Sequence, residues 1–203
     1  INCHRYASSG FLTAFSGARH KAGYKQKPFA YLFDHAVKHV IGDGTHETER
    51  YVQLISDFLS TKVYSPKLYP SVADQQSISP FAIGEYYCMA PGSVWFTKQL
   101  PKEKWVELSM RVGRTKRIYF LGGKNDQALC KEIVDKAGLS NAEILAGKLD
   151  LLGSCALMRT AKMNFVNDSA PLHLASSVNA PVTAFFCSTI PQFGFGPLSK
   201  DSK

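Results

Sequence analysis

Two polar loops carry residue types that can hold an anion. The loop 91–101 contains Gly92, the hydroxyl of Ser93 and the ammonium of Lys98. Glycine permits close approach of the backbone to a ligand, and lysine supplies a point charge for phosphate. The stretch 95–117 carries seven Lys or Arg against two Glu, a local charge of +5. A solvated basic helix behind a polar loop explains the same composition more simply, so this loop alone does not establish a phosphate site.

The second loop spans residues 167–173, and its Asp168 directly follows a predicted strand. Pro171 suits the first turn of a helix. The backbone N–H groups of Ser169 and Ala170 would then point beyond the end of the preceding strand, where a helix N-terminus attracts anions. His173 would face the same crevice. The alternative is that Asp168 only caps the helix and that His173 is an ordinary helix residue.

A third loop, 122–126, contains two glycines and an aspartate but does not match the GxGxxG pattern of dinucleotide sites. Asp126 either accepts a hydrogen bond from a ribose hydroxyl or caps the following helix, and the local sequence favours the cap. No GxxxxGK[ST] motif occurs, which excludes P-loop nucleotide hydrolysis. His35 and His39 have metal-ligand spacing, but no Cys or carboxylate partner lies near them in sequence, so we expect no metal there.

These loops are spaced by alternating strands and helices. Apolar runs predict strands over 86–90, 117–121, 142–145, 163–167 and 181–186. Helical patterns between them predict helices over 101–112, 127–137, 149–160 and 171–178. This order indicates right-handed βαβ crossovers and an α/β fold with a parallel sheet covered on both faces. Ligands bind such sheets at the carboxyl ends of the strands, where all three loops lie.

The chain divides into a mixed region, 1–84, and the regular region 85–203. In the first region we expect a helix over 8–18 and another over 45–62, the latter capped by Thr45. The segment of about 65–80 is rich in proline and serine, and we interpret it as a linker between two lobes.

Composition restricts the class of partner. The 203 residues carry a net charge of +8, which favours nucleic acid, a phosphorylated ligand or an acidic membrane surface. No apolar stretch reaches the roughly 18 residues of a membrane span. Five cysteines without a CxxC pair suggest buried thiols in a reducing compartment, with Cys88, Cys130 and Cys187 in apolar surroundings. The first residues lack an initiator Met, and we expect the chain to be the interior of a longer protein.

The first two loops, separated by two βαβ units, resemble those of the ADP-heptose:lipopolysaccharide heptosyltransferases of glycosyltransferase family nine. Similarity extends over nearly the whole chain and is stronger after residue 85. The segments that carry it are 7–10, 44–50, 90–93, 98–101, 105–108, 167–175, 179–182 and 193–197.

The resemblance implies a GT-B fold of two Rossmann-like lobes with parallel sheets. Residues 1–84 would be an acceptor-side lobe that is N-terminally incomplete, and 85–203 a nucleotide-sugar-binding lobe that is C-terminally incomplete. The implied reaction is inverting, metal-independent transfer of heptose from ADP-heptose to the lipopolysaccharide inner core. It would take place in the cytoplasm of a Gram-negative bacterium, with peripheral contact to the anionic inner face of the inner membrane and no nucleic-acid partner.

The resemblance also implies roles for single residues. Ser93, Lys98, Ser169 and the Ala170 N–H would hold the diphosphate, with His173 in the same crevice. Asp168 would bind heptose hydroxyls, Asp126 the ribose, and Leu149 would lie under adenine. These eight residues are the predicted donor-binding set.

Some features of the family pattern are altered or missing in this chain. Ala170 stands where glycine is common, and the apolar residues 94–96 stand where small or polar residues are common. The family's general base is an aspartate that would lie upstream of Ile1, so we expect these residues alone to bind donor weakly and to show no transfer. Two other functions remain open: a non-catalytic nucleotide-sugar-binding lobe, and a basic nucleic-acid-binding α/β domain. Without upstream sequence, the catalytic residue is unknown.

Overall fold

A computed structural model of the chain describes residues 1–114 and 116–203. Within these residues the chain forms two compact units. Unit 1 comprises residues 1–65 and 191–196, and unit 2 comprises 66–190 and 197–203. The part of the chain that is described contains no helix with both the length and the apolar character required to cross a membrane.

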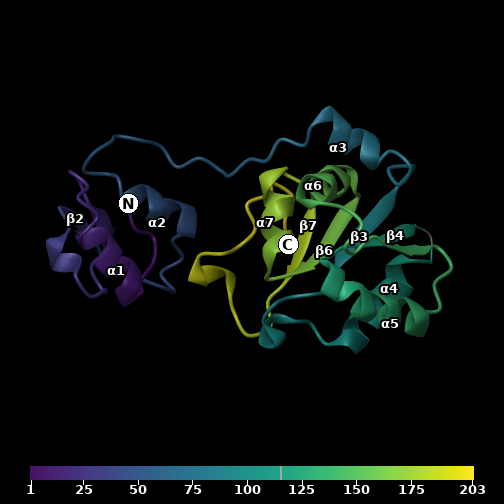
Figure 1. Cartoon of the computed structure of the whole chain (residues 1–203). Helices are drawn as coiled ribbons and strands as arrows, with labels where there is room; N and C mark the ends of the chain where they lie inside the picture. The colour runs from purple at the N-terminus through teal and green to yellow at the C-terminus, as the bar shows by residue number, and fades with distance from the viewer. Residues whose placement is uncertain (115) are drawn as a thin grey trace. The chain divides into compact units, whose positions relative to one another are not determined.

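Unit 2 is built on a five-stranded, all-parallel sheet (Figure 1). The strands, in order across the sheet, are β5 (Ala142–Ile144), β4 (Arg117–Phe120), β3 (Tyr86–Ala90), β6 (Met163–Asn167) and β7 (Val182–Phe185). Each strand lies within one residue of the range that the apolar runs predict. The last residues of the chain extend this sheet beyond β7, because Lys203 N–H donates to the carbonyl of Val182 and Val182 N–H donates to the carbonyl of Asp201.

Helices cover both faces of the sheet. They are α3 (Val72–Ser77), α4 (Lys102–Val112), α5 (Gln127–Ala137), α6 (Leu151–Thr160) and α7 (Ala170–Ser177). One apolar core lies between the sheet and α6 and α7, and the other lies between the sheet and α4 and α5. The α/β class with parallel sheets that the sequence predicts is confirmed.

Alternation along the strands divides the apolar residues between the two cores. Cys88 joins the core under α6 and α7, whereas its neighbour Met89 joins the core under α4 and α5. Tyr119 and Phe120 on β4 divide in the same way. Successive side chains of a strand point to opposite faces, so continuous apolar runs are typical of a sheet that is buried on both sides. Trp105, fully buried on α4, fills the second core.

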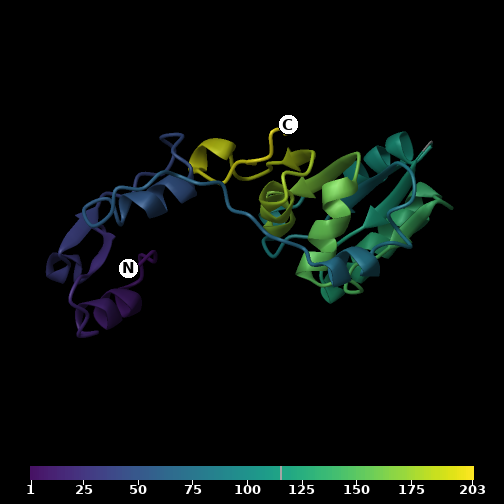
Figure 2. The same cartoon turned by 90° about the horizontal axis from the view of Figure 1, so that it is seen from above.

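The helix boundaries differ from the predictions in two informative places. Pro101 precedes α4 as its N-cap rather than forming its first residue. The expected linker contains α3, which lies beside α6 (Figures 1 and 2). Ser71 and Asp74 form a capping box at the start of this helix, and Ile78 after it is buried against α6 and the sheet. One of the serines on which the linker interpretation relied is therefore the N-cap of a helix.

Unit 1 is smaller and less regular. It contains α1 (Ala7–Ala14), β1 (Ala22–Tyr24), η1 (Ala30–Leu32), β2 (His35–Val37) and α2 (Glu47–Gln53), and β1 pairs with β2 in parallel. The later segment η4 (Pro191–Phe193) also belongs to this unit. Arg50 holds it there, because its buried guanidinium donates to the carbonyl of Phe193 at 3.0 Å while pairing with Glu47 and Asp43.

The prediction of a helix over 45–62 is wrong beyond Gln53. His46, not Thr45, is the N-cap of α2, and the helix ends before Leu54. Phe58 and Leu59 continue the helical spacing of Tyr51 and Ile55 and so form an apolar stripe in the sequence, but both are exposed. Because most helical stability in proteins comes from packing of the apolar face, this stripe does not extend the helix.

Burial of the cysteines follows the prediction only in part. Cys88, Cys130 and Cys155 are buried, whereas Cys187, expected in apolar surroundings, is exposed. Burial raises the pKa of Cys130 to about 12, which keeps this thiol protonated and unreactive. His35 and His39 pair with Asp57 and Glu47, respectively. Among the described residues, no group of three or more His, Cys, Asp or Glu is arranged to hold a metal ion.

One exposed ion-pair cluster connects the starting ends of three strands. Glu85, directly before β3, accepts hydrogen bonds from Lys116 and Lys162, which precede β4 and β6. These bonds and charges lower the pKa of Glu85 to about 2 from its usual 4.5. A carboxylate with a lowered pKa stabilises the fold above its unfolded-state pKa, and this contribution is lost as the pH falls toward the folded value.

We therefore expect the wild-type chain to be more stable than Glu85→Gln near neutral pH, with a difference that shrinks between about pH 4.5 and pH 2. Urea unfolding of both proteins across this range measures the difference. Glu107→Gln is the control, because it removes an exposed pair within α4 and leaves the strand ends untouched. A Glu85→Gln difference that does not change with pH would contradict the assignment.

Candidate functional site

The order of the strands creates a crevice between β3 and β6. From β3 the chain runs outward through β4 to β5, then returns to place β6 on the other side of β3. The connections after β3 and β6 therefore leave in opposite directions from adjacent strands. This topological switch point is where open α/β sheets bind ligands. The first two loops singled out by the sequence are the ones that leave these two strands.

A cavity of about 870 Å³ opens at this point. Its apolar wall is formed by large side chains, namely Leu121, Leu149, Leu151, Met158 and Leu174. Its polar wall presents hydroxyl, amide and charged groups from Ser93, Lys124, Asn125, Asp126, Asp150, Ser154 and Ser169. A volume of several hundred Å³ whose lining includes both large apolar side chains and polar groups is suited to a ligand with an apolar part and a polar part.

The buried amide of Asn167 fixes the loop after β3 to the end of β6. Its Nδ2 donates to the carbonyl of Pro91 at 2.7 Å, and its Oδ1 accepts from the N–H of Leu100 at 3.0 Å. One side chain thus holds both ends of the loop that carries Ser93 and Lys98. Since a buried amide is stable only when its donors and acceptors are paired, the loop and the strand end specify each other.

Asp126 occupies a narrow seat beside two glycines. A Cβ on Gly92 would overlap the Asp126 carboxylate, and a Cβ on Gly122 would lie 2.6 Å from its Oδ2. The carboxylate accepts from the N–H of Gly123 at 2.7 Å. Asp126 stands at the N-cap position of α5 but makes no side-chain bond to that helix; its carboxylate instead makes the capping-box bond at η3 (Lys124–Asp126), the turn that leads into α5. The carboxylate thus bonds to a residue that precedes it in the chain, and it lies at the cavity wall.

Two helices begin at the cavity. Ser169 is the N-cap residue of the eight-residue α7, and Ala170 and Pro171 follow it in the wall. The first N–H groups of a helix lack intrahelical partners and carry the positive end of its dipole. Asp150 is the N-cap of α6, and its Oδ1 accepts from Gly153 N–H at 2.7 Å. Of the two starts, that of α7 remains open to an anion, because Asp150 already places a carboxylate on α6.

Lys98 and Asp168 form an ion pair with a Nζ–Oδ2 distance of 2.6 Å. The Asp168 side chain is 4% exposed and that of Lys98 is 26% exposed. The hydroxyl of Thr189, from the loop after β7, donates to the same oxygen at 2.7 Å. The charge of Lys98 is therefore directed to a buried carboxylate rather than to open solvent.

Comparison with known proteins gives the family. The model of glycosyltransferase family 9 (heptosyltransferase) matches residues 1–203. The chain belongs to this family. Among curated protein sequences, none matches the chain.

Solved structures of family 9 share the fold. ADP-heptose lps heptosyltransferase II of E. coli is 21% identical with a TM-score of 0.75, over 98% of this chain and 66% of that one. A family 9 glycosyl transferase from Veillonella parvula DSM 2008 is 19% identical with a TM-score of 0.82, over 100% and 60%. E. coli heptosyltransferase WaaC with ADP is 20% identical with a TM-score of 0.67, over 99% and 66%. The GT-B class implied by the family resemblance is confirmed, and the chain spans about two thirds or less of these relatives.

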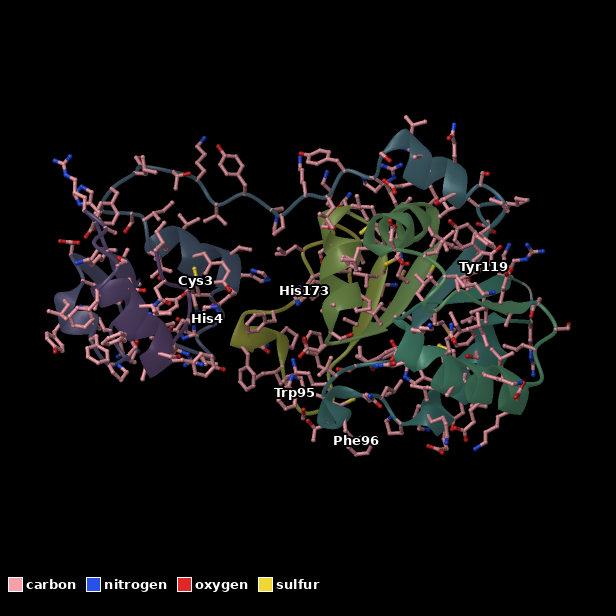
Figure 3. The ribbon with its side chains drawn as sticks, viewed as in Figure 1. Cys3, His4, Trp95, Phe96, Tyr119 and His173 are labelled. Atoms are coloured by element: carbon pink, nitrogen blue, oxygen red, sulfur yellow. The ribbon has the colours of Figure 1, made fainter. Side chains whose placement is uncertain are left out.

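The structure brings most of the predicted donor-binding residues of this family 9 chain to one cavity. Those in its wall are Ser93, Asp126, Leu149, Ser169 and Ala170. Lys98, Asp168 and His173 are not among the lining residues: the first two form their ion pair, and His173 is exposed on α7 (Figure 3). The roles predicted for all eight residues in donor binding stay predictions.

Sequence reasoning missed three residues of the site. Asp150 could have been found, because Asp is a preferred N-cap residue and lies at the start of the predicted 149–160 helix. Asn167 could have been suspected, because a polar residue ends the strand directly before the second loop. Thr189 gives no local signal, since only the pairing of β6 with β7 brings it to Asp168.

The seat of Asp126 makes a test of the cavity. Gly92→Ala should displace the carboxylate or the loop, and we expect ligand affinity at the cavity to fall by about tenfold or more, because a Cβ there overlaps Asp126. Gly138→Ala is the matched control: Gly138 ends α5 in a left-handed conformation with open space around its Cβ position. It should cost about 1 kcal/mol of stability without changing the cavity. Calorimetric titration with ADP and thermal unfolding distinguish the two effects, and equal affinities in both variants would contradict this seat.

Proposed function

We propose that this chain carries the donor site of an inverting glycosyltransferase that moves heptose from ADP-heptose to the inner core of lipopolysaccharide. The main support is the cavity at the switch point, where an apolar wall lies next to an open helix N-terminus and two serine hydroxyls. A nucleoside diphosphate would match both kinds of lining group, because it has a flat base at one end and an anion at the other. Family membership and solved structures of E. coli WaaC with ADP and with ADP-2-deoxy-2-fluoro heptose support this class of donor.

Each wall suits one part of the donor. Adenine would lie on Leu149 and its apolar neighbours, and the ribose hydroxyls would donate to Asp126. The diphosphate would lie against the start of α7, with Ser93 and Ser169 donating hydroxyl hydrogens to phosphate oxygens. The protein would supply its own positive charge through this helix start and Lys98, so we propose that binding needs no metal ion.

Chemistry at the sugar requires an acceptor hydroxyl to attack the anomeric carbon from the face opposite the diphosphate. The leaving diphosphate gains negative charge, which the helix start and the serine hydroxyls would stabilise. A general base would deprotonate the acceptor hydroxyl. The sequence resemblance assigns that base to a segment upstream of Ile1, so the catalytic group remains a proposal about the whole protein.

Placing a negative charge at the start of α7 tests the donor site. Ser169→Glu should weaken ADP binding on the order of a thousandfold, because two like charges about 4 Å apart repel by about 4 kcal/mol at an effective dielectric constant of 20 and each 1.4 kcal/mol is about tenfold in affinity. Calorimetry with ADP in the presence of EDTA measures this and tests metal independence together. Ser140→Glu makes the same charge change at an exposed loop residue before β5 and should leave ADP affinity unchanged.

The outcomes of this titration separate the candidate functions. Loss of ADP affinity in Ser169→Glu but not in Ser140→Glu supports the nucleotide-sugar site, whether or not the protein is a catalyst. If the wild-type chain binds RNA in a strongly salt-dependent manner and ADP does not compete, the basic surface serves nucleic acid and the proposal is overturned. Heptosyl transfer by the whole protein distinguishes the enzyme from a non-catalytic lobe.

We also propose a cytoplasmic location with peripheral contact to the anionic face of the inner membrane. Three consecutive apolar side chains after β3 are exposed: Val94 by 97%, Trp95 by 68% and Phe96 by 85%. Trp95 directly precedes the η2 segment (Phe96–Lys98), and Phe96 is the first residue of that segment (Figure 3). Aromatic side chains favour the membrane–water interface, and the net charge of +8 would be attracted to anionic lipid.

Tryptophan fluorescence reports this contact directly. The chain has two tryptophans, exposed Trp95 and fully buried Trp105, so a blue shift on adding vesicles reports Trp95. We expect a shift with phosphatidylglycerol vesicles and none with phosphatidylcholine. Replacing residues 94–96 by serine should reduce vesicle binding at least about tenfold, whereas Leu59→Ser, at an exposed residue of unit 1, should not. Equal binding by both variants would place the contact elsewhere.

A further inference from the structure

The ion pair between Lys98 and Asp168 conflicts with a simple phosphate contact. Lys98 belongs to the loop that brings Ser93 into the cavity, yet its ammonium lies 2.6 Å from Asp168 Oδ2. A phosphate oxygen at the start of α7 would attract the same ammonium. The two anions therefore compete for one cation.

The two side-chain partners of Asp168, Thr189 and Lys98, differ in how firmly each is held. Thr189 donates to Oδ2 from the loop after β7, and Asp168 N–H donates to the carbonyl of Phe185, so backbone and hydroxyl hold the carboxylate in place. Lys98 is the more exposed member of the pair and sits on a long flexible stem. If the pair opens, the lysine is the member that moves.

We propose that the Lys98–Asp168 pair is a latch that couples recognition of the diphosphate to recognition of the sugar. This inference rests on the proposed donor site. In the structure the latch is closed, with Lys98 Nζ 2.6 Å from Asp168 Oδ2. A diphosphate at the start of α7 draws Lys98 away, and the Asp168 carboxylate, still held by Thr189, becomes available to accept hydrogen bonds from sugar hydroxyls.

The burial of Asp168 makes this exchange depend on the sugar. A carboxylate that is 4% exposed is costly to leave without its cation. With a sugar nucleotide, sugar hydroxyls replace the lost ammonium. With ADP alone nothing replaces it, so the latch tends to close again and weakens the hold on the diphosphate. The site therefore favours the intact donor over the nucleotide product, which assists product release after transfer.

Asp168→Asn tests the latch because it removes the competing anion and keeps the shape of the side chain. We expect the variant to bind ADP about tenfold more tightly than wild type, because Lys98 is then free for the phosphate. Adenosine, which lacks the diphosphate, should bind both proteins equally. ADP-heptose should gain less than ADP, or lose affinity, because the amide is a weaker acceptor for sugar hydroxyls.

Two further variants complete the design. Lys98→Ala should abolish the effect of Asp168→Asn on ADP, so the double variant binds ADP like Lys98→Ala alone. Asp135→Asn is the matched control, since it breaks an exposed Lys–Asp pair on α5 and should leave every affinity unchanged. Thr189→Val should weaken ADP about threefold and leave adenosine unchanged, because the carboxylate then loses its remaining partner when Lys98 departs.

The sign of the Asp168→Asn effect decides the matter. If ADP binds Asp168→Asn more weakly than wild type, Asp168 positions Lys98 for phosphate and the latch is overturned. Unchanged ADP affinity overturns it as well. Failure of the wild-type chain to bind ADP at all contradicts the proposed donor site instead, so the two failures are distinguishable.

Discussion

The site depends on a single buried amide. Asn167 ends β6 and bonds to both ends of the loop after β3, so that the two strands at the switch point share one polar contact. Without it, the buried carbonyl of Pro91 would lack this partner, which costs about 1–3 kcal/mol, and the partly buried N–H of Leu100 would lose its bond as well. Correct pairing of these groups selects one conformation of the loop. The placement of Ser93 and Lys98 follows from that selection.

The second constraint on the site is the close approach of glycine backbone to neighbouring residues around the cavity. Gly92 and Gly122 leave room for the Asp126 carboxylate, and Gly147 passes so close to Lys124 that a Cβ would lie 2.8 Å from its Cα. Three connections from different strands thereby converge around a volume that side chains do not fill. The cavity is a consequence of missing side-chain atoms as much as of the groups that line it.

The sequence is sufficient to predict elements that are determined by local pattern. All five strands of unit 2 follow from apolar runs, and Gly138 marks the end of α5. Prediction fails where packing decides: Phe58 and Leu59 continue a helical stripe but are exposed, so α2 is short.

The candidate site likewise has features that local sequence predicts and contacts that it does not. Loops that leave strands can be found from the order of strands and helices, and five of the eight predicted residues line the cavity. The partners within the site depend on contacts between residues distant in sequence. Lys98 meets Asp168 only when β3 and β6 are adjacent, and Thr189 joins them only when β7 pairs with β6. No local pattern specifies such a contact, and therefore the charge pairing emerged only from the structure.

The pairing of β3 with β6 also has a consequence for how the protein reaches its native state. Tyr87 pairs with Met163, so the two halves of the sheet join across a long stretch of intervening chain. Closing a large loop costs entropy before the contact it permits stabilises anything, and such non-local parallel pairing is slow. The β3–β4–β5 half can be assembled from nearer neighbours, but the crevice does not exist until β6 docks. Ligand binding should consequently appear late in refolding, and a nucleotide present during folding would stabilise only the completed sheet.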